Sequence, residues 1–407
     1  MPGCAGRSNH DPGLARVYGS DALNLDLNEE QKQVQRTVRE FAENEVKPLA
    51  RAIDETGEFP RETFRKAAEL GLTGIALPET EGGAGLDHIA YSIVIEEISR
   101  VCASTGVILS VQNSLYCDPI HRFGTADQKR QFLAPFARGE KIGCYALTEP
   151  QAGSNAAALT TNAVRQGDRY IVNGTKAWIT NAGVADAAIV YVNTDPAQGE
   201  KGITALVVER GTSGFRAGKE EKKLGIHATA CAELSFTDCE VPVGNRIGNE
   251  GEGYKVALST LDGGRIGIAA QATGIAQGAF EQALAYAQQR QAFGHPIADF
   301  QAIQFMLADM ATEIDAARLL VRKAAWKQDT GARFTLEASI AKLFASELAT
   351  RVTHKAMQIH GGNGYSCEYP VERMYRDARI TEIYEGTSEI QRLVIAAWVL
   401  KNEGRAP

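Results

Sequence analysis

The spacing of apolar residues changes twice along the chain, and these two changes restrict the possible folds more than any single motif does. From Asn28 to about Ala137, apolar residues recur at helical spacing. Between Gly143 and about Gly248, short β-rich runs alternate with turns of Gly, Pro and Asp. Helical spacing returns at Tyr254 and continues to the end. The order of elements is therefore helices, strands, helices.

This order predicts an α+β protein with an N-terminal all-α domain over 25–142, a middle β domain over 143–253 and a C-terminal helical domain over 254–407. The middle domain is expected to be a β-barrel or a sandwich. In the C-terminal domain, long helices with short connections are typical of an antiparallel four-helix bundle. These helices are predicted at about 254–290, 300–329, 335–361 and 386–401.

Three short patterns give finer predictions. Asn28, followed by two glutamates and a glutamine, is typical of a helix N-cap. Asn173-Gly174 stands between two β-rich runs and predicts a hairpin turn there. Ser388, with Gln391 three residues later, fits a capping box and is expected to begin the last helix.

Composition excludes several classes of function. Lys and Arg number 43 against 50 Asp and Glu, a net charge of −7, and no long basic run suggests a surface for nucleic acid or anionic membrane. The chain has no run of about 18 apolar residues, so no membrane-spanning helix is expected. The 7 cysteines form no C-x-x-C pair, which is typical of reduced thiols, and the 7 histidines lack metal-ligand spacing, so no metal is expected. Residues 1–24 lack an apolar signal core and are predicted to be a disordered leader.

Four segments hold more glycine and polar residues than their positions require: 145–155 at the entry to the β domain, 178–181 at a strand end, 358–364 at a helix end, and 383–391 before the last helix. Small residues and hydroxyls let backbone amides approach an anionic or planar ligand closely. Structural alternatives exist for the first three: an ordinary loop, a core tryptophan, and a glycine cap beside a structural His360.

Glu385 in the fourth segment is the candidate general base. It precedes Gly386 and the start of the last helix. The free backbone amides of the first helical turn and the positive end of the helix dipole point toward this position. A carboxylate between Tyr384 and Gly386 in such a pocket would have its pKa raised by desolvation, as a general base needs. Spacing alone leaves open the alternative of a solvated loop glutamate.

Together, these segments resemble the acyl-CoA dehydrogenase family, and specifically its short-chain, butyryl-CoA-type branch. The resemblance covers about residues 25–402. Each motif is weak alone, but seven of them occur in the family's order on a matching α–β–α layout. The matching stretches are 145–154, 178–180, 261–266, 290–294, 358–362, 375–380 and 383–392.

The resemblance implies FAD-dependent α,β-dehydrogenation of a short-chain acyl-CoA thioester to the trans-2-enoyl-CoA, as in fatty acid β-oxidation. Glu385 would take the α-proton while flavin N5 takes the β-hydride, and the electrons would pass to electron-transferring flavoprotein. Family members take part of the FAD site from a neighbouring subunit, which implies a homo-oligomer, usually a tetramer. The expected compartment is the cytoplasm of a bacterium, with the mitochondrial matrix as the alternative.

The resemblance also assigns roles to single residues. Thr148 and Thr180 would donate hydrogen bonds to the flavin, and Arg290 would meet the FAD pyrophosphate. Arg265 could meet the CoA end of the substrate or form an ion pair with Asp262. The implied substrate-binding residues are Ser154, Asp262, Arg265 and Gly386. The implied cofactor-binding residues are Tyr145, Ala146, Leu147, Thr148, Gly153, Ser154, Trp178, Ile179, Thr180, Arg290, Gln301, Gln358, Ile359, His360, Gly361, Gly362, Thr387, Ser388 and Glu389.

Two side chains that other family members carry are absent from this sequence, and their absence restricts the expected substrate. Isovaleryl- and long-chain-type members carry their base on the long helix at the position of Gly264, so Glu385 is the expected base here. The stretch 103–110 lacks the arginine that glutaryl-type members carry. A short straight-chain substrate is the first prediction and a 2-methyl-branched short chain the second. A non-catalytic acyl-CoA- or flavin-binding relative is a further alternative, disfavoured by Glu385 beside complete flavin segments. Flavin-monooxygenase relatives lack the glutamate, and acyl-CoA oxidases are usually much longer.

Overall fold

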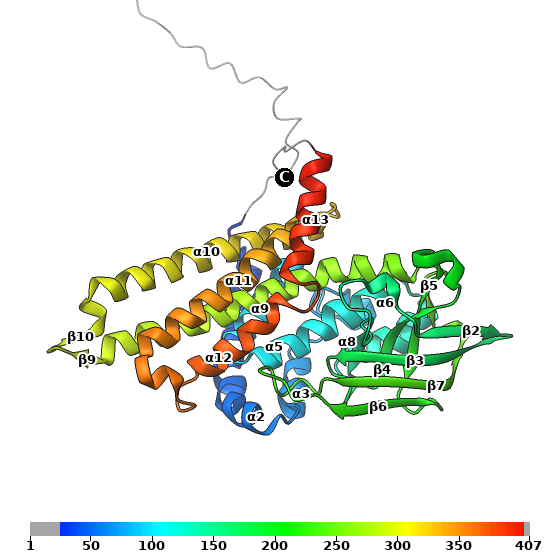
Figure 1. The fold of residues 1–407 in the computed structure, drawn as a ribbon, viewed down its shortest axis with the longest axis horizontal. Coiled ribbons are helices and arrows are strands. Elements are labelled where there is room, and N and C mark those ends of the chain that lie inside the picture. Colours follow the sequence, from blue (N-terminus) through cyan, green and yellow to red (C-terminus); the bar gives the residue numbers. More distant parts are fainter. Residues whose placement is uncertain (1–24, 403–407) are drawn as a thin grey trace, which may run out of the picture.

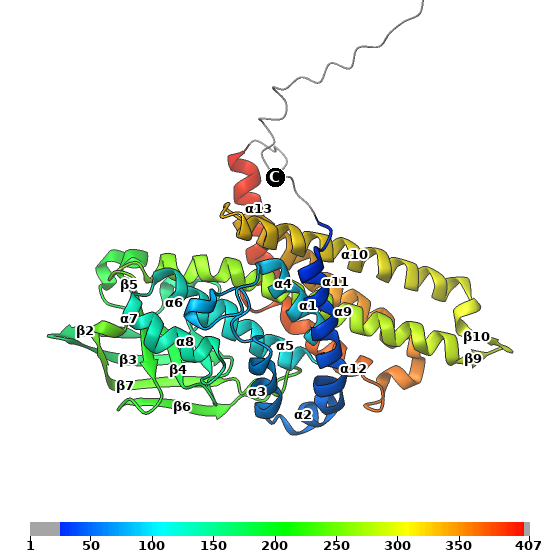
Figure 2. The ribbon, with the colours of Figure 1, turned by 180° about the vertical axis from the view of Figure 1, so that it is seen from behind.

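The computed structural model describes residues 25–402, so the predicted leader over 1–24 lies outside the described residues. Figures 1 and 2 show helices from both ends of the sequence packed together, with a sheet at one end of the molecule. This arrangement confirms the predicted order of helices, strands and helices. The exact limits of the three domains stay predictions.

The N-terminal part is helical from its first turn. Asn28 caps the first helix as predicted, because its Oδ1 accepts from the Gln31 amide at 2.8 Å and the Gln31 side chain bonds the Asn28 amide at 3.0 Å. The stretch from α5 through a π-helical segment to α6 is almost entirely buried. The helices are α1 (Glu29–Phe41), α2 (Ala50–Thr56), α3 (Arg61–Glu69), α4 (His88–Ser99), α5 (Ala103–Ser110), α6 (Asp118–Phe123), α7 (Ala126–Gln128) and α8 (Ala134–Ala137).

The middle part is an eight-stranded sheet in the order β6-β7-β3-β2-β4-β5-β8, with β1 parallel to β4. β2 pairs with β4 only at Asn162 and Asn193, and one apolar core includes residues from β3, β7, β4 and β5. This core lies between the two halves of the sheet, as in a barrel or sandwich. The strands are β1 (Gly143–Ala146), β2 (Asn162–Gln166), β3 (Arg169–Ile179), β4 (Ala187–Asn193), β5 (Ile203–Glu209), β6 (Phe215–Glu220), β7 (Ala232–Pro242) and β8 (Arg246–Ile247).

The hairpin predicted at Asn173-Gly174 is wrong. β3 continues through these residues, and the real turn lies between Gln166 and Arg169, the last pair of β2 and β3. β3 pairs with β2 on one side and β7 on the other, and its register with β7 shifts between Val172 and Gly174. Asn-Gly therefore marks a bulge, where Gly174 adopts φ 144° and a Cβ would lie 2.6 Å from the Thr161 backbone.

Three long helices of the C-terminal part pack side by side (Figure 1). α4 of the N-terminal part packs against α9 as well. The last helix starts against α11 and projects from the rest of the molecule (Figure 1). The helices are α9 (Gly253–Gln289), α10 (Gln301–Asp329), α11 (Thr335–His360), α12 (Val371–Ala378) and α13 (Ser388–Lys401), with a small hairpin of β9 (Gln291–Ala292) and β10 (His295–Pro296) after α9.

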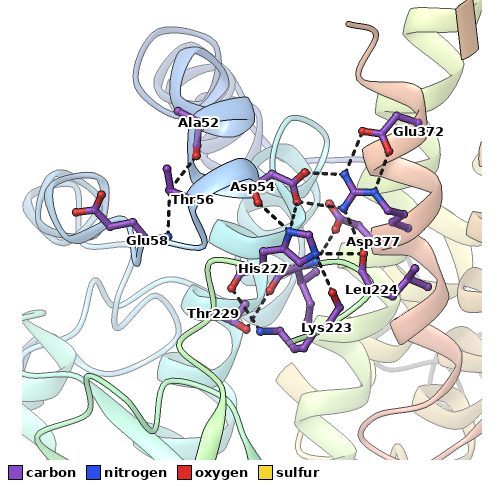
Figure 3. Close-up of polar contacts among 12 residues, drawn as sticks. Ala52, Asp54, Thr56, Glu58, Lys223, Leu224, His227, Thr229, Glu372 and Asp377 are labelled. Atoms are coloured by element: carbon purple, nitrogen blue, oxygen red, sulfur yellow. Dashed lines mark hydrogen bonds and ion pairs between the residues drawn. The ribbon is translucent and has the colours of Figure 1, made fainter. Parts of the chain in front are cut away.

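The three parts meet at a polar junction of α2, the loop over 223–229 and α12 (Figure 3). Asp54 on α2 accepts from Arg376 on α12 at 2.6 Å. His227 lies between backbone oxygens, with Nδ1 2.8 Å from the Asp54 oxygen and Nε2 2.9 Å from that of Lys223. Asp377 accepts the Ile226 amide at 2.6 Å. Hydrogen bonds thus join α2 to α12, α2 to the loop, and the loop to α12 at this junction.

Candidate active site

Glu385 stands in the connection between the short helix η12 (Arg379–Glu382) and α13. Its backbone is left-handed, with φ 51°, and Gly386 follows at φ 93°. The N-cap of α13 is Thr387, whose hydroxyl accepts from the Ile390 amide at 3.3 Å. The predicted cap at Ser388 is therefore one residue late. The left-handed turn has already directed the chain into the helix before Ser388, which is buried with an unpartnered hydroxyl.

The carboxylate of Glu385 points at α9. Its Oε2 is buried and makes no hydrogen bond within the described part of the chain. A Cβ at Gly264 would overlap this oxygen and would lie 2.8 Å from Leu115. The missing side chain at Gly264 therefore makes the space that the carboxylate occupies.

Burial raises the pKa of Glu385 to about 8, and the charges of Lys342 and Arg265 partly oppose this rise. This confirms the predicted direction and cause of the shift and rejects a solvated loop glutamate. Three tyrosines surround the group, but each hydroxyl bonds elsewhere: Tyr91 to Ser110, Tyr145 to the Ala257 oxygen and Tyr384 to Gln271. Burial is the largest cause that raises the pKa of all three phenols, and the Glu385 charge raises it further.

Arg265 and Asp262 form the ion pair that was one of the two predicted roles. Arg265 donates to Asp262 at 2.8 Å, and the other Asp262 oxygen accepts from Thr335 at 2.7 Å. The Nε of Arg265 is buried without a partner. Asp262, Arg265 and Gly386 lie together, because a Cβ at Gly386 would be 3.8 Å from the Arg265 guanidinium. Ser154, the fourth predicted substrate residue, is exposed in the loop after β1.

A cavity of ≈ 570 Å³ opens on the same stretch of α9. It reaches Gly263, the neighbour of Gly264, and Tyr91, one of the tyrosines near Glu385. Its lining includes the basic residues His88, His121, Arg122 and Arg333. The polar and charged lining residues are His88, Tyr91, Asn113, Ser114, Asp118, His121, Arg122, Ser259, Asp262, Gln328, Arg333 and Thr335.

The two predicted flavin segments of the β domain lie side by side. The Ala177 amide donates to the Thr148 oxygen at 2.9 Å, which joins the loop after β1 to the end of β3. Trp178 adopts φ 61° and is 60% exposed, so it is not a core residue. An exposed indole fixed beside Thr148, with open space around Gly153, fits a planar aromatic ligand such as a flavin ring.

The remaining predicted cofactor residues lie elsewhere. Arg290 and Gln301 are exposed at the far end of α9 and the start of α10, and 358–362 ends α11, where His360 stacks on Tyr286 at 4.3 Å. Tyr145 contacts Ala257 near the start of α9, which is 33 residues before Arg290. At 1.5 Å per residue, Ala257 and Arg290 are about 50 Å apart along α9. One chain therefore presents its predicted FAD residues in two separate places.

Several buried polar residues at the site were missed from sequence. Lys342 of α11 and Gln391 of α13 both donate to the Gly386 oxygen, at 2.8 and 2.9 Å. Lys176 and Glu149 form a buried ion pair at 2.7 Å behind Trp178 and Thr148. A lysine within the alanine-rich run of α11 was the one available signal for Lys342, but an exposed helix face gives the same pattern.

Models of the N-terminal, middle and C-terminal domains of acyl-CoA dehydrogenase match residues 28–140, 144–239 and 251–400. The chain belongs to the acyl-CoA dehydrogenase family. It is therefore a flavin-dependent oxidoreductase with FAD as its cofactor. Within the described residues, no helix is long and apolar enough to cross a membrane, and no cluster of three potential metal ligands occurs.

Among relatives in the acyl-CoA dehydrogenase family, the short-chain specific acyl-CoA dehydrogenase of Clostridium acetobutylicum is 52% identical over 379 residues, 93% of this chain and 100% of that protein. Butyryl-CoA dehydrogenase of Megasphaera elsdenii matches with a TM-score of 0.91 and 45% identity over 93% of this chain and 100% of its own. A chain in the structure of the electron transferring flavoprotein of Acidaminococcus fermentans matches with a TM-score of 0.92 and 47% identity, also over 93% and 100%.

Proposed function

We propose that this enzyme dehydrogenates a short-chain acyl-CoA, such as butyryl-CoA, with Glu385 as the base that removes the α-proton. The observation that carries this proposal is the buried, unpartnered Oε2 of Glu385, whose pKa is raised to about 8. The short-chain specific and butyryl-CoA dehydrogenases that it resembles support the chain length. The cavity ending at Gly263 supports the direction from which a thioester would approach.

The chain supplies position, exclusion of water and a proton acceptor. Glu385 would accept the proton on its carboxylate, whose buried Oε2 has no hydrogen-bond partner among the described residues. Arg265 is fixed by Asp262 beside Gly386, where its unpaired Nε can meet a polar group of the substrate. Thr148, Trp178 and Thr180 would hold the flavin ring. Bound FAD supplies the two-electron oxidation that makes loss of a weakly acidic α-proton feasible.

The separation of the two FAD groups supports a shared cofactor site. Because Arg290 lies about 50 Å along α9 from Ala257, the residue that Tyr145 contacts, we assign Arg290, Gln301 and 358–362 to the FAD of a neighbouring subunit in a homotetramer. Thr387, Ser388 and Glu389 adjoin Glu385 and are assigned to the FAD of their own chain. Electron-transferring flavoprotein is the proposed electron acceptor, supported by the likeness to a chain in the A. fermentans structure.

An anaerobic absorbance titration of the holoenzyme with butyryl-CoA tests this function. We expect butyryl-CoA to bleach the flavin band in the wild type, whereas Glu385→Gln keeps FAD, binds acyl-CoA and is not bleached. Isobutyryl-, 2-methylbutyryl- and octanoyl-CoA serve as parallel substrates. Wild-type-like bleaching of Glu385→Gln would exclude Glu385 as the base. Faster bleaching by 2-methylbutyryl-CoA would favour the branched-chain substrate.

A further inference from the structure

Lys342 is a fully buried lysine in the middle of α11, and its relative exposure is 0%. Its Nζ donates to the backbone oxygen of Gly386 at 2.8 Å. Burying an ammonium group is costly unless a negative charge compensates for it, and one neutral carbonyl does not. A charge that balances Lys342 must therefore lie close by.

Four charged groups face Lys342: Glu385, Arg265, Glu382 and Glu389. Glu382 is already paired with Arg379 at 2.7 Å, and Glu389 is exposed. Arg265 is a second cation and has its own partner. Glu385 is the remaining carboxylate of this group. Its Oε2 is buried and has no hydrogen-bond partner among the described residues.

The same conclusion follows from the surroundings of Glu385. Charged and titratable groups face it from α9 (Arg265), α11 (Lys342), α4 (Tyr91), β1 (Tyr145) and its own loop (Tyr384). The tyrosines are neutral and bond elsewhere, and Asp262 neutralises Arg265. Among these groups, Lys342 is thus the cation whose charge is available to balance that of Glu385.

We propose that Lys342 is a positioning residue for the base. Through the Gly386 oxygen it fixes the left-handed turn that directs the Glu385 carboxylate onto Gly264, and its positive charge favours the ionised form of that carboxylate. This inference rests on the proposed role of Glu385.

The pKa values of Lys342 and Glu385 agree with an interaction between their charges. Burial lowers the pKa of Lys342 to about 8, and the Glu385 charge is the largest influence opposing that fall. Lys342 is likewise the largest influence opposing the rise in the pKa of Glu385. Each charge therefore favours the charged form of the other group. Removing the ammonium charge should leave Glu385 protonated up to a higher pH.

Three variants of the holoenzyme separate the effect of the Lys342 charge from that of its hydrogen bond to Gly386. Lys342→Gln retains a hydrogen-bond donor for Gly386 but no charge, and Lys342→Arg retains the charge. Lys355→Gln is the matched control, since Lys355 lies on the same helix and pairs with Asp309 on the surface at 3.1 Å. The readouts are the pH profile of kcat/KM and an infrared titration of the Glu385 carboxyl band, identified by its loss in Glu385→Gln.

For Lys342→Gln, both midpoints should move up by about one pH unit or more. Below the midpoint kcat/KM should fall about tenfold and recover at high pH, since one unit of pKa changes the ionised fraction tenfold. Lys342→Arg and Lys355→Gln should keep the wild-type midpoint. A Lys342→Gln enzyme with wild-type midpoints in both readouts overturns the inference, while an inactive Glu385→Gln in the same series leaves the proposed function standing. An active Glu385→Gln overturns the function instead.

If Lys342→Gln does not fold, the titration of Lys342 itself tests the same coupling. In Glu385→Gln, followed by nitrogen-15 NMR of the lysine side chains, Lys342 should lose its proton at a lower pH than in the wild type. An unchanged Lys342 midpoint would equally overturn the inference.

Discussion

At the scale of single residues, the candidate site depends on one space shared by two positions. Gly264 and Glu385 come from different elements, and the carboxylate of one fills the volume that a side chain on the other would need. The sequence pointed to Glu385 as the candidate base and predicted a raised pKa for it. The close approach to Gly264 and the burial of Lys342 depend on how α9, α11 and the loop pack, which no local pattern records.

Gly264→Ala tests this shared space. Its Cβ would displace the Glu385 carboxylate, and a misplacement of about 1 Å can lower the rate about 100-fold. We expect kcat/KM to fall by that order while FAD content and circular dichroism stay normal. Gly244→Ala is the control, because a Cβ there meets nothing within 4 Å. Full activity of Gly264→Ala would show that the base does not rest against α9.

The pH dependence of the wild type follows from the raised pKa of Glu385. Only the ionised carboxylate accepts a proton, so kcat/KM with butyryl-CoA should rise with pH and reach half its maximum near the pKa of about 8. A profile that is already flat at about pH 6 would indicate an unperturbed carboxylate.

At the scale of elements, the junction of α2, the 223–229 loop and α12 holds the three parts together (Figure 3). Arg376 bridges Asp54 of α2 and Glu372 of its own helix, at 2.6 and 2.8 Å. The guanidinium is partly buried, so both carboxylates depend on it for compensation.

Replacing Arg376 should therefore weaken the fold without touching the site. We expect Arg376→Met to lower the free energy of unfolding by about 2–3 kcal/mol, below the value for a fully buried pair because solvent reaches part of this one. Arg351→Met is the comparison, since its pair with Glu313 is more exposed and should contribute under about 1 kcal/mol. Urea denaturation of both variants decides, and equal effects would contradict the assigned role of the junction.

Elements differ in how well sequence predicts them. The limits of α9, α10 and α11 agree with the predicted helices to within about two residues, because their apolar spacing and capping glycines are local. The Asn173-Gly174 hairpin failed because β7 pairs along the other edge of β3, a contact between distant segments. The cap of α13 was misplaced because a strained turn determines where the helix begins.

At the scale of the whole molecule, α9 separates two groups of predicted cofactor residues. We expect Arg290→Ala to reduce the ratio of flavin to protein or to weaken the oligomer, since Arg290 is proposed to bind the FAD of a neighbour. Absorbance and light scattering measure both quantities. Arg216→Ala on the exposed strand β6 is the control. Stoichiometric FAD in an unchanged oligomer would remove Arg290 from the cofactor site.

The contact between Gly264 and Glu385 also limits how this enzyme can evolve. A descendant that carries its base on α9 needs two changes, and both orders pass through a weakened enzyme. A larger residue at 264 first would collide with the existing carboxylate, whereas loss of Glu385 first would remove the proposed base. Because neither single step is expected to be neutral, substitutions at the two positions should be correlated among descendants of this enzyme.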